Sequence, residues 1–265
     1  MSTIPDPAAD QHVEQLLELA AKLAHTAREL ETTRDSRCVF THAYSLMTER
    51  IAAQLPRFQP ADAAWIAGLA VAFAARYYAA LAGETDSDAW RAAFAAMRDR
   101  RTSVLEDLVF AMSVHILHDL PLALGDVSPR RSPELEHVYD FHAVNDMLKD
   151  AVEPIVATTA RRYGPYIRWL DRLTYPYDQI LTDYGVRMAR GLAWYNALRL
   201  ADPHSADQAR AAIEKSPMII IQDVIDPPIR SLRAPLRIMR WITSFLRRWP
   251  KPTSPRGLTL PPQLS

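Results

Sequence analysis

The chain has 265 residues, 49% hydrophobic and 23% charged, with 20 prolines and only 7 glycines. This composition excludes a collagen-like chain and one disordered throughout, and the length suffices for one large domain with its own hydrophobic core. The 31 basic and 31 acidic residues cancel, but residues 226–265 hold eight bases and one acid, a net charge of +7 that leaves −7 for residues 1–225. The sequence therefore predicts an acidic body with a basic tail.

The body is predicted to be all-helical, a compact bundle of seven or eight helices. Glycine is scarce, good helix formers are abundant, and neither Asn-Gly nor Asp-Gly hairpin signals occur. Asp62 and Ser103 are the expected N-caps of two helices and Gly83 a C-terminal residue, whereas Pro56 and Pro121 are expected to end helices. These signals place helices at 12–32, 38–55, 62–81, 87–97, 103–120, 132–152 and 179–200, with a further helical stretch around 166–173.

Four parts are expected along the chain. Residues 1–34 form an N-terminal helix, and residues 35–202 form a helical core domain that carries the candidate site. Residues 203–249 comprise an extended segment, favoured by the β-prone run at 218–221, and a basic amphipathic helix. Residues 250–265 are rich in proline and poor in apolar side chains, which predicts a disordered tail.

The compartment is expected to be cytoplasmic. Cys38 is the single cysteine, so it forms no internal disulfide, and the first residues lack the basic and apolar regions of a secretory signal. No uninterrupted run of 18 apolar residues occurs, so we expect no membrane-spanning helix.

The fifth predicted helix carries the strongest functional signal. Residues 108–117 (LVFAMSVHIL) have no charge and are apolar all round the helix, a pattern typical of a helix buried on every side. Yet this helix also holds His115, His118 and Asp119. At 100° per residue, His115 and Asp119 lie about 40° apart on one face. Ionisable groups are costly in a core unless they are paired, bind a metal or line a cavity.

The sixth predicted helix directs His137 and Asp140 towards the core, together with its apolar residues. His142 and Asp146 are expected to face water, and Asn145 to flank the inner face. If the fifth and sixth helices pack together, two histidines and two carboxylates meet. They would form a site for a divalent metal such as zinc, with the ligands His115, Asp119, His137 and Asp140.

Two metal-free interpretations remain open. In the first, an acid–base cluster has the catalytic residues His115, Asp119, Asp140 and Asn145, with His115 as the base. In the second, the same side chains form a structural polar network that joins the helices.

Two blocks of the sequence carry a resemblance. His115-x-x-x-Asp119-Leu-Pro-Leu-Ala-Leu and Asp140-Phe-x-x-Val-Asn145, with aromatic residues of the earlier helices, resemble an uncharacterised bacterial helical family, a domain of unknown function, over roughly residues 35–200. The resemblance implies an all-helical fold and favours His115, Asp119, Asp140 and Asn145 as its polar set. His118 falls at a position that looks variable in the family pattern, as does His142.

A weaker similarity is to the zinc-dependent phospholipases C, which use an HxxxD and an HxxxE pair on buried helices as zinc ligands. His115 and Asp119 match the first pair, whereas His142 and Asp146 match the second only approximately. The N-terminal amino ligand and the further metal histidines of those enzymes have no clear counterparts here.

The tail helix after residue 235 indicates a docking role. Arg237, Arg240, Arg247 and Arg248 lie on one arc with apolar residues on the rest, which is the pattern of a helix in a membrane interface. The alternative is a terminal helix packed on the acidic body. Nucleic-acid binding is not expected, because the bases are confined to one helix without a known motif.

The sequence thus favours an enzyme that acts on a small or lipophilic molecule in a pocket of the bundle, by His/Asp acid–base or metal-assisted chemistry. The alternatives are a phospholipase C-like zinc hydrolase and a non-catalytic protein that binds a membrane or a partner.

Overall fold

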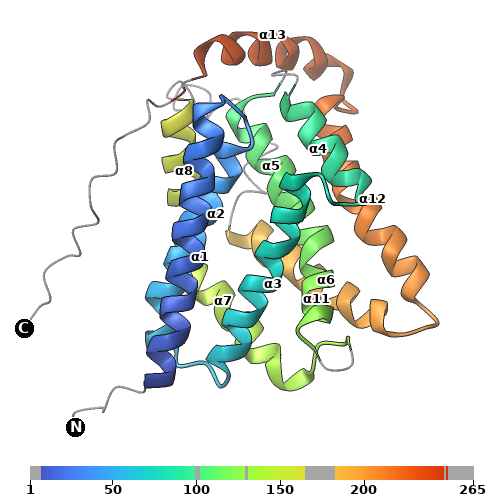
Figure 1. Ribbon diagram of the computed structural model, residues 1–265. Helices are drawn as coiled ribbons and strands as arrows, with labels where there is room; N and C mark the ends of the chain where they lie inside the picture. Colours follow the sequence, from blue (N-terminus) through green and yellow to red (C-terminus); the bar gives the residue numbers. More distant parts are fainter. Residues whose placement is uncertain (1–6, 99–101, 129–130, 165–182, 248, 250–265) are drawn as a thin grey trace, which may run out of the picture.

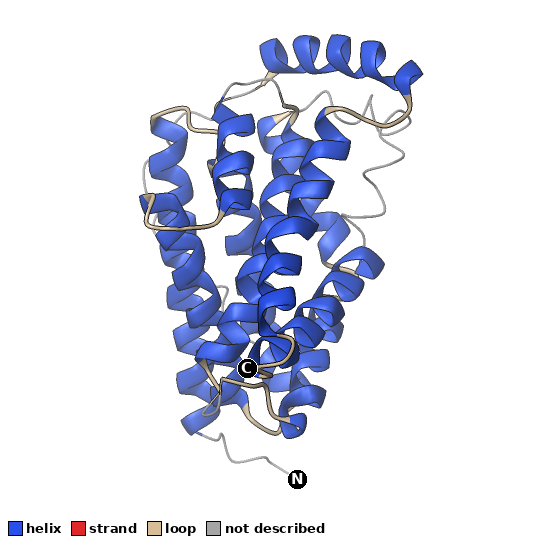
Figure 2. Cartoon of the chain, turned by 90° about the vertical axis from the view of Figure 1, so that its right-hand side faces the viewer, coloured by secondary structure: helices blue, strands red, loops and turns tan. Residues whose placement is uncertain are grey.

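The computed structural model describes residues 7–98, 102–128, 131–164, 183–247 and 249. Across these ranges the regular structure is helical and there is no strand, so the predicted all-α fold is confirmed (Figure 2). The elements in chain order are α1 (Pro7–Thr32), α2 (Cys38–Phe58), α3 (Ala63–Ala82), α4 (Asp88–Arg98), α5 (Val104–Val114), the π-helix η1 (His115–Asp119), α6 (Leu120–Asp126), the 3-10 turn η2 (Leu135–His137), α7 (Val138–Leu148), α8 (Val152–Tyr163), α11 (Asp183–Ala201), α12 (Ala206–Ile225) and α13 (Arg230–Leu246).

The capping signals are confirmed. The side chain of Asp62 accepts a hydrogen bond from the backbone N–H of Trp65 at the start of α3. Gly83 ends that helix with a φ of 79°, a left-handed conformation that glycine adopts without steric cost. At the start of α5, Ser103 and Glu106 form a capping box in which each side chain bonds the other residue's backbone N–H.

Two prolines do not end helices as predicted. Pro56 lies inside α2, which runs on to Phe58. Pro121 lies at the start of α6, directly after the π-helical turn that joins α5 to α6. A π turn is wider than an α turn, and we attribute the continuation of the helix to this extra room. Residues 104–126 therefore form one helical rod.

Two further elements differ from the prediction. The β-prone residues 218–221 lie within α12, because tertiary packing overrides their local preference. The helix expected at 132–152 is divided: α7 ends at Leu148, and Asp150 adopts a left-handed φ of 58° before α8 begins. The stretch expected to be helical at 166–173 and the tail at 250–265 lie outside the described residues.

The rod formed by α5, η1 and α6 is the core of the bundle. It contacts α2, α3, α4, α8, α11 and α12 along its length, while α1 packs beside α2 (Figure 1). Every residue of α5 is buried. These neighbours on all sides explain why the segment is apolar all the way round.

Two helical stretches, Ala63–Ala82 and Val104–Asp126, are long and apolar enough to cross a membrane by length and composition. Neither stretch contains 18 apolar residues in an uninterrupted run, so the sequence criterion used above did not detect them. In the most apolar 18-residue window of the second stretch, 83% of the residues are buried inside the bundle, as in the core helix of a soluble protein, and in that of the first stretch 39% are buried. Two such helices are weak evidence for membrane insertion.

Helix α13 lies across one end of the bundle (Figure 1). Arg240 pairs with Glu106 at 2.7 Å and Arg247 pairs with Asp107, and both carboxylates are fully buried at the start of α5. Two of the four arginines that were expected to face a membrane therefore point to the acidic body. Arg237 is exposed, and Arg248 lies outside the described residues.

Candidate functional site

The site is built on the π turn His115–Asp119. In this turn the backbone N–H of Leu120 donates to the carbonyl of His115, five residues earlier, instead of four. Such single π turns are rare and often occur at functional sites. Within this turn, Nδ1 of His115 and Nδ1 of His118 both reach the carboxylate of Asp119.

Asp119 is the centre of the polar cluster and is only 2% exposed. Its carboxylate lies 2.9 Å from Nδ1 of His115 and 2.8 Å from Nδ1 of His118, and it accepts the indole N–H of Trp90 at 2.9 and 3.1 Å. Burial acts to raise the pKa of Asp119, but the hydrogen bonds and charges of the two histidines outweigh it and bring this pKa below its usual value. The group is therefore an anion at neutral pH.

His115 has one occupied and one open ring nitrogen. An ionised carboxylate only accepts hydrogen bonds, so Nδ1 of His115 carries the proton that Asp119 accepts. Its Nε2 is buried and has no hydrogen-bond partner among the described residues. Burial lowers the pKa of His115 more than Asp119 raises it. The imidazole is therefore neutral at pH 7, with a lone pair on Nε2.

Aromatic rings hold the imidazole of His115 in place. Phe73 of α3 stacks on it at 3.5 Å between ring centroids, with an interplanar angle of 5°. The ring of Tyr44 on α2 meets it edge-on at 4.8 Å. Because its position is fixed by packing and by Asp119, His115 presents Nε2 in one orientation.

His118 continues the cluster to the surface. Its Nε2 lies 2.8 Å from Oε1 of Glu214 on α12. The other oxygen of Glu214 accepts bonds from the hydroxyl of Ser87 and the N–H of Ala89, each at 3.3 Å. The Glu214 side chain is 37% exposed. A continuous hydrogen-bonded series thus runs from solvent through Glu214, His118 and Asp119 to His115.

A cavity of about 90 Å³ lies in the middle of the bundle, between α2, α3, η1, α7 and α11. Its wall is mostly apolar. The polar side chains in the wall are those of Tyr44, Thr48, His115 and Arg190. The hydroxyl of Tyr44, like Nε2 of His115, is buried without a partner among the residues described.

Asn145 positions Arg190 and does not contact His115. Its Oδ1 accepts a 2.6 Å hydrogen bond from Nε of Arg190, whose Nη2 donates to the carbonyl of Phe141 at 2.9 Å. Nδ2 of Asn145 faces Nδ1 of His142 at 3.2 Å. Asn145 is 4% exposed, so the expectation that it flanks the inner face is correct.

His137 and Asp140 do not join His115 and Asp119, contrary to the predicted metal set. Asp140 points inward as expected, but its carboxylate accepts the backbone N–H groups of Ala61 and Asp62 at 2.9 and 2.7 Å, just before α3. The ring of His137 stacks on Trp65 at 4.5 Å.

The length of α3 measures this separation. His115 stacks on Phe73, eleven residues beyond Asp62, and this spacing corresponds to about 16 Å of helix. The prediction failed because it inferred the packing of two helices from their faces alone. The axial offset between helices does not follow from periodicity.

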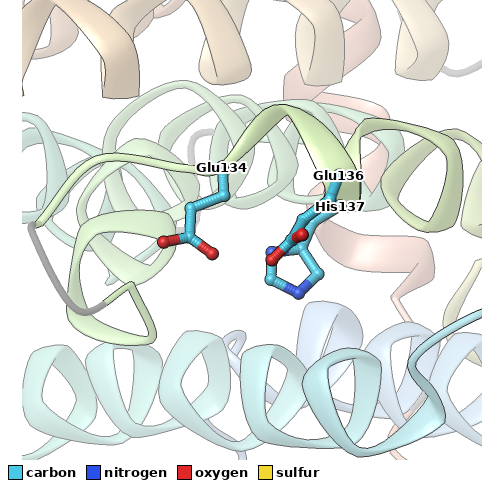
Figure 3. A group of neighbouring side chains, drawn as sticks. All are labelled: Glu134, Glu136 and His137. Carbon is cyan, nitrogen blue, oxygen red and sulfur yellow. The ribbon is translucent and has the colours of Figure 1, made fainter.

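A different group of possible metal ligands lies at the start of α7. Glu134, Glu136 and His137 each offer one ligand atom, and these atoms lie within 4.8 Å of one another (Figure 3). Glu136 is exposed and the other two are partly exposed. Acidic groups at a surface often gather without a metal, and no other feature here indicates one. His142 and Asp146 face outward as predicted, and Asp146 pairs with Arg187 at 2.9 Å.

Trp90, Glu214 and Arg190 were not predicted as site residues. A buried tryptophan N–H usually has a hydrogen-bond acceptor, so the sequence could have suggested that Trp90 bonds a polar group. It could not have identified Asp119 as that group. Glu214 belongs to a helix with many charged residues, and no spacing distinguishes it. Arg190 lies three residues after Arg187, a spacing typical of arginines that pair with carboxylates, so it did not indicate a cavity residue.

Comparison with known proteins identifies a family. Residues 16–227 match a family described as "Family of unknown function (DUF5995)". No curated protein and no solved structure matches the chain. Because the match covers most of the chain, the protein belongs to the DUF5995 family, which agrees with the helical family of unknown function suggested by the sequence blocks around His115 and Asp140.

Proposed function

We propose that this protein is an enzyme that acts on a small lipophilic molecule inside the bundle cavity, with His115 as its acid–base residue. One observation carries the proposal: the neutral imidazole of His115, oriented by a buried carboxylate, has an Nε2 atom at the wall of an apolar cavity that no described residue hydrogen-bonds. A base must be held in reach of its substrate with its lone pair unoccupied.

The surrounding residues give each step a physical basis. When Nε2 takes a proton from the substrate, His115 becomes an imidazolium, and the charge of Asp119 stabilises it at 2.9 Å. The aromatic walls exclude water, which strengthens this interaction. To complete the turnover, His115 returns the proton on Nε2 to the product or to water that enters the cavity, which restores the lone pair. His118, itself held by Glu214, keeps Asp119 in place by a hydrogen bond.

Acid–base chemistry without a metal is favoured, because most of the atoms that could bind a metal are already hydrogen-bonded. Asp119 already accepts three N–H groups, and both nitrogens of His118 face carboxylates. Nε2 of His115 is the open ligand atom of this cluster, and one histidine is too few for a zinc site.

The test compares the wild-type protein with His115→Asn. The asparagine amide can replace the Nδ1 donor towards Asp119, but it removes Nε2. Both proteins are incubated with a lipophilic metabolite extract in H₂O and in D₂O, and the compounds are followed by mass spectrometry. His42→Asn is the matched control, because His42 is a partly buried histidine outside the cavity wall.

We expect the wild type and His42→Asn to consume at least one compound or to introduce deuterium into it, and His115→Asn to lose this activity. The proposal is overturned if the wild type changes no compound. It is also overturned if His115→Asn, folded as judged by circular dichroism, retains the activity.

A second function, docking to a lipid surface, is supported by the outer face of α13. Ile238, Trp241, Ile242 and Leu246 are 60, 65, 45 and 49% exposed on this helix, and Arg237 is exposed beside them. An amphipathic helix with tryptophan, aliphatic residues and a base on its outer face fits a membrane interface. We place the contact on this apolar face, since Arg240 and Arg247 are paired with the body.

Flotation with anionic phospholipid vesicles tests this second function. Ile238→Glu should reduce the bound fraction severalfold by placing a charge in the contact. Ile219→Glu is the control, because Ile219 is 45% exposed on α12. Absence of flotation of the wild type at low salt, or equal loss in the two variants, contradicts the lipid contact.

A further inference from the structure

Arg190 is a buried cation that has no carboxylate partner in the part of the chain that the structure describes. The residue is 7% exposed, and its two hydrogen bonds go to the neutral oxygens of Asn145 and Phe141. Its guanidinium also lies over the ring of Phe141 at 4.3 Å from the centroid. Within the described residues it forms no ion pair. Two hydrogen bonds use two of the five N–H donors of a guanidinium and leave three for another acceptor.

The neighbouring charges do not supply this acceptor. Arg187, one turn away on α11, forms ion pairs with Asp183 and Asp146, each at 2.9 Å. Burial, and secondarily the charge of Arg187, lower the pKa of Arg190 to about 10, which leaves it a cation at neutral pH. A buried charge is normally paired, because its desolvation costs several kcal/mol.

Arg190 belongs to the wall of the same cavity as His115. We propose that the cavity binds a lipophilic anion, with its acidic group, a carboxylate in the simplest case, at the guanidinium of Arg190. The apolar part of the anion lies against the aliphatic and aromatic walls beside His115. A carboxylate accepts two parallel N–H bonds from an arginine, which gives such a ligand one orientation. This inference rests on the proposed function in taking the cavity as the substrate site.

The size of the cavity restricts the ligand. An engineered cavity of about 150 Å³ accommodates benzene. The cavity here is about 90 Å³, so the part of the ligand that it holds must be smaller than benzene. A second pocket of about 820 Å³ shares Met112, Ile116 and Val186 with it. These three side chains separate the two spaces, and methionine is flexible enough to let a longer chain pass. Butyrate, hexanoate and octanoate are therefore suitable probes.

The experiment measures binding by calorimetry with the full-length wild-type protein. Hexanoate is compared with hexanol and hexylammonium, which have nearly the same apolar part but a neutral and a positive head group. We expect hexanoate to bind about 10- to 100-fold more tightly than hexanol, the range of a charge-assisted hydrogen bond. Hexylammonium should bind more weakly than both. The inference is overturned if hexanol binds as tightly as hexanoate, or if none of the carboxylates binds.

Arg190→Gln should bring hexanoate and hexanol to equal affinity. Arg187→Gln is the matched control on the same helix, because Arg187 is outside the cavity wall, and it should preserve the preference. If Arg190→Gln does not fold, the head-group comparison on the wild type decides the question alone. Retained anion preference in a folded Arg190→Gln variant also overturns the inference.

His115→Asn separates this inference from the proposed function. The variant should still prefer hexanoate over hexanol, because Arg190 is intact, while turnover is lost. Turnover by the wild type without an anion preference refutes only the ligand class. An anion preference without any turnover refutes only the enzymatic function.

Discussion

Asp119→Asn removes the charge at the centre of the polar cluster with almost no change of shape. In the wild type the carboxylate accepts N–H groups from His115, His118 and Trp90. An asparagine retains one acceptor oxygen, but it places an NH₂ group where the second oxygen was. This group then faces an N–H donor unless a histidine changes its tautomer.

The energetic cost of Asp119→Asn follows from the hydrogen bonds that the substitution removes. A hydrogen bond to a charged group contributes about 1.5–3 kcal/mol, and a buried donor left unsatisfied costs about 1–3 kcal/mol. Asp119→Asn removes the charge from these bonds, and the change of His115 to the Nε2–H tautomer leaves that buried N–H without an acceptor among the described residues, so the free energy of unfolding should fall by about 3–5 kcal/mol. Asp126→Asn is the matched control on α6. The side chain of Asp126 is 39% exposed and pairs with Arg76, and exposed pairs contribute at most about 1 kcal/mol.

Two measurements check this prediction. Urea denaturation at pH 7.5 gives the free energy of unfolding of both variants. Nitrogen-15 NMR of the imidazoles reports the tautomer, which should change at His115 from Nδ1–H to Nε2–H in Asp119→Asn. A loss of less than 1 kcal/mol together with an unchanged tautomer would refute the assignment of Asp119 as the residue that orients His115.

Three further predictions concern stability. Asp140→Ala should lower the free energy of unfolding in urea by about 2–4 kcal/mol, because two backbone N–H groups lose a buried charged acceptor. Turnover by the folded variant should persist. Loss of turnover at unchanged stability would contradict the structural role of Asp140. Arg247→Met should lower the free energy of unfolding by about 3–5 kcal/mol, because it leaves Asp107 buried without its cation. Adding Asp107→Asn should restore most of this stability. A double variant as unstable as Arg247→Met would contradict the role of the ion pair. Burial, against the opposing effect of Arg247, raises the pKa of Asp107 from 3.8 to about 6. Folding therefore favours the protonated acid, and this group's stabilisation is full below about pH 4 and lost as pH rises through 6, about 3 kcal/mol in all. Denaturation across pH 4–8 should show this fall in the wild type but not in Asp107→Asn, and parallel curves would disprove it.

The sequence by itself determined the features that depend on neighbours within one helix. Helix caps at Asp62 and Ser103 were predictable because the cap and its N–H partner are three residues apart. The pairing of His115 with Asp119 was predictable because residues four apart share a helix face. The burial of their helix followed from its uniformly apolar surface, and the inward and outward faces of α7 from its periodicity.

Only the tertiary structure decided which helices meet and at what height. Asp140 faces inward as predicted, yet it reaches the start of α3, about three helical turns from the level of His115. Glu214 and Arg190 enter the site from helices distant in sequence, and the inner face of α13 is set by the buried carboxylates Glu106 and Asp107. Periodicity gives the rotation of a helix about its axis. It carries no information about axial offset or about the choice of neighbours, and these decide which polar groups share a cavity.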